Sequence, residues 1–266
     1  MKFVQTAERV SHKDISDNYV SQLSILEYSE AAKLVSGKVL EIGTGSGYGI
    51  ELIASQATKF ITLDKSEPEA ISKKQMIQHE NVEFIKMKVP PLNNISDNSF
   101  DFVITFHVIE HIENDKFFVD EIFRVLKNKG KLIVTTPNKK MSLTRNPWHV
   151  REYTVSELEN LLLKNFQSVR KLGVFGKKAI MEYYYKNKAS VGKISRFDFF
   201  NLQYRLPRWL LKIPYDILNR WNRKKILRNN SILVSEISMS DYYLDKANDE
   251  CFALFYIAKK MTASDK

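Results

Sequence analysis

The most informative stretch of the sequence is Val39-Leu40-Glu41-Ile42-Gly43-Thr44-Gly45-Ser46-Gly47-Tyr48-Gly49. A short apolar run that carries one carboxylate leads into four glycines at alternate positions, and a helical pattern follows. Glycine tolerates positive φ and lets the backbone pass close to a ligand. A strand-to-helix turn at a binding site needs both properties. Taken alone, the stretch is also compatible with a glycine-rich surface turn. The segments that follow it in the sequence distinguish a binding loop from such a turn.

The spacing of these glycines is G-x-G-x-G. Counting from Gly43, the dinucleotide fingerprint G-x-G-x-x-G would need a third glycine where Tyr48 stands. With Glu41 just upstream, the stretch resembles the first motif of class I S-adenosylmethionine-dependent methyltransferases. The resemblance implies that S-adenosylmethionine is the methyl donor. It also implies that Glu41, Gly43, Gly45 and Gly47 hold the methionine end of this cofactor.

A second expected strand, residues 60–64, ends in a carboxylate. Asp64 lies seventeen positions past Gly47. That spacing places an acidic side chain at the carboxyl edge of the neighbouring strand, where it can reach the ribose hydroxyls. We expect Lys65 to line the same pocket. The alternative for Asp64 is a turn-forming or capping role.

The segment after the third expected strand departs from the family. Many relatives have an acidic residue at the place of Met87-Lys88, where it accepts a hydrogen bond from the adenine amino group. Lys88 has donors only and cannot accept this bond. We expect adenine to lie near Met87 and Lys88 and to be held by Met87, by backbone groups near Val89, or by the side chains of residues 93–94.

The remaining pattern alternates apolar strands with helices, which predicts a parallel sheet covered on both faces. The fold class is therefore α/β: a Rossmann-like, seven-stranded, mostly parallel sheet with helices on both faces, plus a basic helical insertion before the last strand. The resemblance implies that the final strand is antiparallel. The expected domain organisation is an N-terminal helical cap (1–36), a methyltransferase domain (37–176 and 251–260), a basic aromatic helical insertion (177–250) and a tail (261–266).

The residues from His107 to His111 match H-x-x-E-H, the inverted zinc-peptidase signature. A zinc-dependent peptidase is therefore an alternative, but it needs two histidines one helical turn apart and a third ligand. Here the motif directly follows an expected strand, and nothing downstream marks a third ligand, so we expect no metal. A similar motif follows the fourth strand in many small-molecule and quinone-type O-methyltransferases. That resemblance implies that Phe106 and His107 line the sulfonium side of the pocket.

Two histidines are candidate catalytic bases, His111 and His149. The histidine pKa lies near neutrality, which suits a group that accepts a proton from the methyl acceptor. Alternatively there is no dedicated base, because alignment of the nucleophile with the sulfonium methyl group supplies much of the acceleration; His107 and His111 would then be a pocket wall and a helix cap. The fragment 146–154 resembles a loop of methyltransferases that act in polysaccharide and lipid-linked sugar synthesis.

One segment carries the whole charge imbalance of the chain. The net charge is +10, and residues 186–230 contain twelve Lys/Arg against two Asp/Glu. In residues 205–228, apolar residues recur at three- and four-residue steps between the cationic ones, and Pro214 is expected to kink or split the helix. This pattern is typical of an interfacial helix on an anionic membrane surface. The alternatives are packing on the core, nucleic acid or an anionic sugar-phosphate.

The composition of the chain suggests where in the cell the protein is found. The chain has 266 residues, of which 44% are hydrophobic, yet no apolar run approaches the roughly 20 residues that span a bilayer. The only cysteine, Cys251, cannot form an internal disulfide. We expect a cytoplasmic protein that is peripheral at the inner membrane face.

The predicted function is methyl transfer to an oxygen of a small or lipid-linked acceptor, either sugar or quinone-like. The alternatives are the zinc-dependent peptidase, a non-catalytic module that binds S-adenosylmethionine or membrane, and an RNA methyltransferase that uses the basic insertion.

Overall fold

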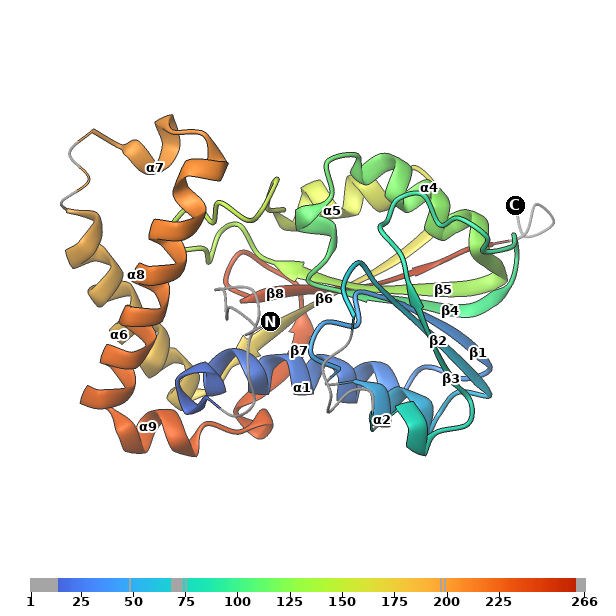
Figure 1. Cartoon of the computed structure of the whole chain (residues 1–266), viewed down its shortest axis with the longest axis horizontal. Coiled ribbons are helices and arrows are strands. Elements are labelled where there is room, and N and C mark those ends of the chain that lie inside the picture. Colours follow the sequence, from blue (N-terminus) through green and yellow to red (C-terminus); the bar gives the residue numbers. More distant parts are fainter. Residues whose placement is uncertain are drawn as a thin grey trace.

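A single sheet runs through the molecule. The computed structural model describes residues 14–47, 49–67, 74, 76–196, 198 and 200–261. In this part of the chain eight strands form one sheet in the order β3-β2-β1-β4-β5-β8-β6-β7 (Figure 1). The strands are β1 (Lys38–Ile42), β2 (Lys59–Asp64), β3 (Val82–Lys86), β4 (Phe100–Phe106), β5 (Leu126–Pro137), β6 (Ser168–Gly176), β7 (Tyr242–Lys246) and β8 (Ala253–Lys259).

Most of the sheet is parallel, as predicted. The strands from β3 to β5 pair in parallel. β8 is antiparallel to both β5 and β6, and β7 is antiparallel to β6. The Rossmann-like fold is confirmed, with one strand more than expected. The additional strand is β7, which lies within the residues predicted to be a helical insertion. It is short, lies at the edge of the sheet and is mostly exposed, so its sequence lacks the apolar run that is typical of a buried strand.

Helices cover both faces of the sheet (Figure 1). α1 (Asn18–Ala32) and α2 (Ile50–Ala54) lie on one face, and α4 (Asp115–Val125) and α5 (Val155–Leu162) lie on the other. The buried side chains form two clusters, one under each pair of helices. The described residues also include the short 3-10 turns η1 (Ile15–Asp17), η2 (Ile109–His111) and η3 (Met239–Asp241).

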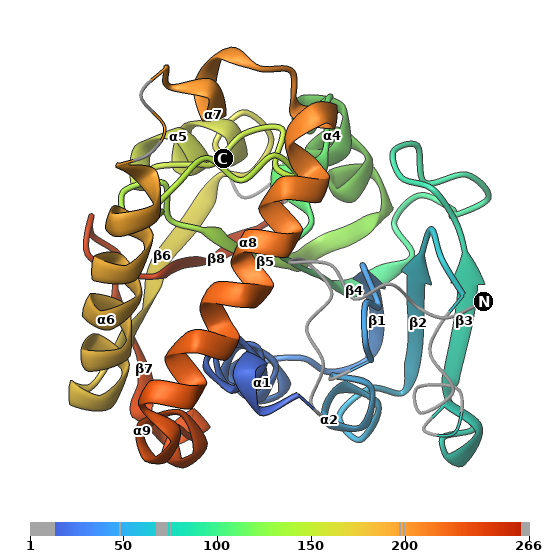
Figure 2. The same cartoon turned by 60° about the vertical axis from the view of Figure 1, so that its left-hand side comes forward.

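In the described residues between β6 and β7, four α-helices form the insertion. They are α6 (Lys178–Ser195), α7 (Leu202–Arg205), α8 (Arg208–Asn229) and α9 (Ser231–Glu236). α6 and α8 lie side by side at one end of the sheet (Figure 2). α8 continues through Pro214 as one helix, so the proline does not split it. The hydrogen bond that proline removes would have gone to the carbonyl of Leu210, and this residue is exposed.

Buried ion pairs anchor the insertion to the N-terminal helices. Arg220 Nη1 lies 2.8 Å from Asp17 Oδ1, and Arg223 Nη1 lies 2.8 Å from the same oxygen. Asn18 Nδ2 also donates to the carbonyls of Val234 and Ile237. Two cationic side chains of the segment predicted to bind an anionic membrane surface therefore form ion pairs within the protein instead. Within the described residues, none of the helices combines the length and the apolar character that a bilayer-spanning segment needs.

Candidate active site

The glycine loop connects β1 to α2 and adopts conformations that favour glycine. The φ angles are 100° at Gly43, 53° at Gly45 and 77° at Gly47. A Cβ atom added at Gly43 would lie 2.4 Å from Cγ2 of Val108, just after β4. The loop therefore needs glycine for its backbone and, at Gly43, for close packing.

The structure brings the predicted ribose-binding carboxylate to this loop. Asp64 Oδ2 accepts a hydrogen bond from the backbone N–H of Gly45 at 3.1 Å. The backbone N–H of Met87 donates to the carbonyl of Asp64 at 2.8 Å, so the segment after β3 lies at the same edge of the sheet. Met87 is half-buried, and the side chains of Lys65 and Lys88 are exposed. Direct contact of these side chains with a cofactor stays a prediction.

Glu41 lies beneath the loop in a buried network. Its side chain is 2% exposed and accepts hydrogen bonds from Tyr28 Oη at 2.6 Å and from the hydroxyl of Thr62. Burial raises the pKa of Glu41 to about 7, although both hydrogen bonds oppose the rise. A Cβ atom at Gly49 would lie 2.0 Å from the Tyr28 ring, so α1 packs tightly on the loop. Tyr28 was not predicted as a site residue, because its only signal in the sequence is an aromatic hydroxyl on the apolar side of the expected helix.

Beyond β4, His107 lies between two carboxylates. Its φ is 54°, its Nε2 lies 2.9 Å from Glu27 Oε2, and its Nδ1 lies 3.5 Å from Glu110 Oε1. Burial alone would lower the pKa of His107, but the charges of Glu27 and Glu110 raise it well above its usual range. Phe106 is buried, with its ring edge-on to Tyr28 at 4.8 Å.

This geometry does not form the histidine pair of a zinc peptidase. The His107 ring contacts Glu27 of α1, whereas His111 Nδ1 lies 3.0 Å from the carbonyl oxygen of Trp148. The motif follows the end of β4 and ends in a 3-10 turn, so it does not lie on the helix that would align two histidines one turn apart.

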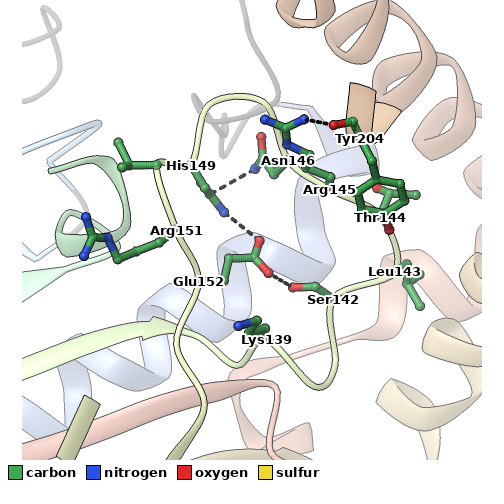
Figure 3. A pocket seen from close by; sticks show the side chains of 11 residues that line it. Lys139, Ser142, Leu143, Thr144, Arg145, Asn146, His149, Arg151, Glu152 and Tyr204 are labelled. Atoms are coloured by element: carbon green, nitrogen blue, oxygen red, sulfur yellow. Dashed lines mark hydrogen bonds and ion pairs between the residues drawn. The ribbon is translucent and has the colours of Figure 1, made fainter. Parts of the chain in front are cut away.

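The two candidate bases lie close together in the structure. The ring centroids of His111 and His149 are 5.1 Å apart. His149 also lines a cavity of about 290 Å³ formed by residues of the 139–152 loop and Tyr204 (Figure 3). In this cavity His149 Nδ1 lies 2.7 Å from Glu152 Oε1, and Glu152 Oε2 accepts a short hydrogen bond from Ser142.

The same loop is tied to the start of α8. Trp148 Nε1 donates to Asp216 Oδ1 at 3.0 Å, and Lys212 Nζ lies 4.2 Å from the centroid of the Trp148 ring. Arg208 Nη1 donates to the carbonyl of His149 at 3.3 Å. The insertion is therefore attached to the loop that forms this cavity.

A Rossmann-like sheet with a G-x-G-x-G loop after its first strand and a carboxylate at the end of its second defines a class I methyltransferase arrangement. A family model described as a methyltransferase domain matches residues 40–134. A probable S-adenosylmethionine-dependent methyltransferase of Mycolicibacterium smegmatis is 34% identical over 177 residues, which cover 64% of this chain and 68% of that protein. A Mycobacterium tuberculosis protein with the same description has the same identity and is covered to 64%. The chain belongs to the family of S-adenosylmethionine-dependent methyltransferases.

More distant similarities extend to particular enzymes. A ubiquinone biosynthesis O-methyltransferase of Rickettsia typhi is 28% identical over 133 residues, covering 49% of this chain and 51% of that enzyme. Among solved structures, a methyltransferase of Thermotoga maritima described as a possible histamine N-methyltransferase has a TM-score of 0.55 at 18% identity, covering 91% and 92% of the two chains. The [4+2]-cyclase SpnF has the same TM-score at 17% identity, covering 92% and 82%. At these identities the solved structures support the fold alone.

Proposed function

We propose that this enzyme transfers the methyl group of S-adenosylmethionine to an oxygen of an amphiphilic small molecule, such as a lipid-linked sugar or a quinone-like compound, at an anionic membrane surface. The observation that carries this proposal is an exposed apolar stripe on α8. The exposed fractions are 70% for Trp209, 71% for Ile213, 63% for Ile217 and 52% for Trp221. Their four-residue spacing places them along one side of the helix, and large apolar side chains exposed together mark an interaction surface.

The charges around this stripe favour lipid headgroups. The exposed Lys224 and Arg228 continue the stripe toward the end of the helix, and Lys225 Nζ lies 4.8 Å from the centroid of the Trp221 ring. An apolar side with tryptophan and a cationic flank is typical of a helix that lies in the interface of an anionic bilayer. Arg220 and Arg223 contribute little to this surface, because they pair with the buried Asp17.

The position of α8 connects this surface to the acceptor cavity. The helix begins beside the 139–152 loop, to which it is attached through Trp148 and His149. An acceptor anchored in lipid would thus present its polar end at the cavity without leaving the membrane. The similarity to ubiquinone biosynthesis O-methyltransferases supports an oxygen acceptor of this amphiphilic kind.

The residues around the loop fit S-adenosylmethionine, which supplies an electrophilic methyl group when bound. The positive-φ glycines open the backbone at the end of β1, and the Asp64 carboxylate lies beside Gly45, where it can accept hydrogen bonds from ribose hydroxyls. His107, Glu27 and Glu110 together carry a net negative charge when His107 is protonated, which favours a cationic sulfonium nearby.

On the acceptor side, we assign His111 and His149 to activation of the acceptor hydroxyl. Methyl transfer then depends on holding the oxygen in line with the methyl group and removing its proton.

Vesicle binding tests the membrane part of this proposal. Wild-type protein should co-sediment with phosphatidylcholine vesicles that contain phosphatidylglycerol and much less with phosphatidylcholine alone. The double variant Ile213→Ser/Ile217→Ser should bind at least about tenfold more weakly, because each buried aliphatic side chain contributes about 1.5 kcal/mol or more. Ile232→Ser is the matched control, since Ile232 is 70% exposed but lies on α9. Equal binding of the wild type and the double variant would refute membrane contact through α8.

A further inference from the structure

Two buried carboxylates share one histidine beside the cofactor loop. Glu27 of α1 is 0% exposed, and its two oxygens lie 2.9 and 3.1 Å from His107 Nε2. Glu110 of η2 is 1% exposed, and its Oε1 lies 3.5 Å from His107 Nδ1. A buried carboxylate without a partner is costly, so both carboxylates need the imidazole ring. A neutral imidazole has one N–H, whereas the protonated ring has two and can serve both.

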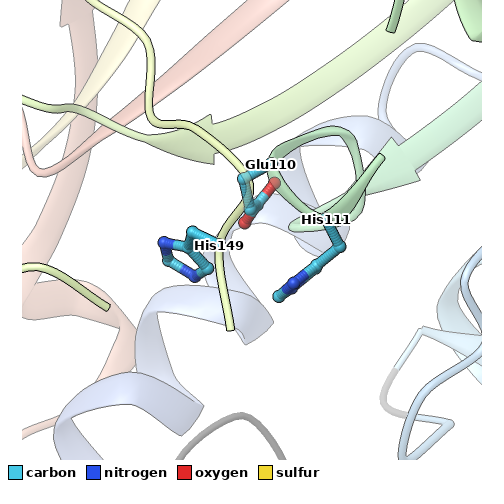
Figure 4. Close-up of side chains that lie close together, drawn as sticks. All are labelled: Glu110, His111 and His149. Carbon is cyan, nitrogen blue, oxygen red and sulfur yellow. The ribbon is translucent and has the colours of Figure 1, made fainter. Parts of the chain in front are cut away.

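The charges of these three side chains do not cancel. With His107 protonated, two negative charges face one positive charge, so the Glu27–His107–Glu110 group is anionic. Burial would lower the pKa of His107, but the charges of Glu27 and Glu110 raise it well above its usual range. Burial would raise the pKa of Glu110, but the neighbouring His107 lowers it. His111 and His149 also lie near Glu110 and act on its pKa in the same direction as His107 (Figure 4).

The Glu27–His107–Glu110 group lies next to the glycine loop. β1 and β4 pair in parallel, so the loop that follows β1 and the histidine that follows β4 lie at the same edge of the sheet. Val108, the residue after His107, packs so closely on the loop that a Cβ atom at Gly43 would lie 2.4 Å from its Cγ2. The histidine is therefore one residue away from direct contact with the loop.

α1 brings Glu27 to the same loop. Tyr28, the residue after Glu27, packs on the loop so tightly that a Cβ atom at Gly49 would lie 2.0 Å from its ring. Its hydroxyl donates to Glu41 at 2.6 Å. Burial raises the pKa of Glu41 to about 7, so this carboxyl is mostly protonated at pH 6 and adds little charge there. Near pH 6 the negative charge at this end of the loop therefore comes from the Glu27–His107–Glu110 group.

We propose that Glu27 sets the selectivity of this enzyme for S-adenosylmethionine over its product, S-adenosylhomocysteine. The inference rests on the proposed function and on the expected position of His107 at the sulfonium side of the pocket. During transfer the acceptor oxygen bonds to the methyl carbon, the electron pair of the carbon–sulfur bond stays on sulfur, and the hydroxyl proton passes to a base or to solvent. The sulfur changes from a cationic sulfonium to a neutral thioether. The anionic group attracts the sulfonium and not the thioether, which favours release of the product.

A purely structural role for Glu27 predicts a different pattern. Glu27 also holds α1 to the end of β4 through His107, and loss of this contact alone would loosen the pocket. The two ligands share the adenosine and the amino-acid end and differ only at sulfur, so a loosened pocket would weaken both alike. An electrostatic role weakens only the cationic ligand. The ratio of the two affinities therefore separates these roles.

Calorimetric titration of the full chain with each ligand at pH 6 measures this ratio. The wild type should bind S-adenosylmethionine at least about tenfold more tightly than S-adenosylhomocysteine. In Glu27→Gln the remaining pair with Glu110 keeps His107 protonated at this pH, so the group has no net charge. This variant should lose at least about tenfold in affinity for S-adenosylmethionine and less than about threefold for S-adenosylhomocysteine.

Two variants control for changes in α1. Glu27→Asp keeps the negative charge and should keep the affinity ratio, even if the shorter side chain weakens both ligands. Glu30→Gln makes the same change as Glu27→Gln on the same helix, at a carboxylate that pairs with the exposed Lys33. It should bind both ligands like the wild type.

The outcomes separate this proposal from the proposed function. An equal loss for both ligands in Glu27→Gln would overturn the selectivity role. If that variant does not fold, the wild type decides, because binding of S-adenosylhomocysteine as tight as that of S-adenosylmethionine would also overturn it. The titrations contain neither acceptor nor vesicles. Failure of vesicle binding, or of labelling of an organic-extractable acceptor, would refute the proposed function and leave the selectivity in place.

Discussion

Replacing Glu41 with glutamine should remove a pH-dependent instability beneath the cofactor loop. Burial raises the pKa of Glu41 from 4.5 to about 7, against the opposing hydrogen bonds of Thr62 and Tyr28. Between these values the folded protein holds a proton that the unfolded chain releases. The free energy of unfolding therefore falls as the pH rises from about 4.5 to 7 and levels off above it. At about 1.4 kcal/mol per pH unit, the loss amounts to about 3 kcal/mol.

Urea unfolding of cofactor-free protein at pH 5 and pH 8 measures this effect. A glutamine at position 41 keeps an oxygen for Tyr28 and carries no charge to desolvate. Glu41→Gln should be more stable than the wild type by about 2 to 3 kcal/mol at pH 8, and the difference should shrink to below about 1 kcal/mol at pH 5. Glu51→Gln, an exposed change in the neighbouring α2, should show no such difference. The same stability difference at both pH values would refute the argument.

Two further substitutions test other parts of the structure. Asp64→Ala should weaken S-adenosylmethionine binding at least about tenfold, or about 1.4 kcal/mol, because it removes the carboxylate beside Gly45. Calorimetry measures this affinity, and an unchanged value would contradict the assignment of Asp64 to the ribose hydroxyls. Asp17→Asn should lower the free energy of unfolding by about 3 kcal/mol, because Arg220 and Arg223 would lose their buried anionic partner. Urea denaturation measures this loss, and an unchanged midpoint would show that the pairing adds no net stability.

The sequence predicts the parts of the site that depend on short stretches. The G-x-G-x-G loop and the strand that ends at Asp64 are local patterns, so their residues could be named before the fold was known. Their meeting at Gly45 follows from the rule that neighbouring parallel strands end at the same edge of a sheet.

The sequence does not predict pairings between distant segments. Glu27 and His107 are 80 positions apart, and Asp17 and Arg223 are 206 positions apart. Neither pair has a local signature, because a charged residue on a helix is normally solvated. His149 likewise joins Glu110 only when the loop folds over η2. These long-range contacts could be found only in the structure.

Label partitioning tests the central claim most directly. Purified enzyme is supplied with methyl-labelled S-adenosylmethionine and a fractionated cell extract, with Asp64→Ala as the control for dependence on the cofactor site. We expect label in the organic-extractable fraction with the wild type and at least about tenfold less with the variant at limiting cofactor. Label confined to the aqueous small-molecule or nucleic-acid fraction would contradict an amphiphilic acceptor at the membrane.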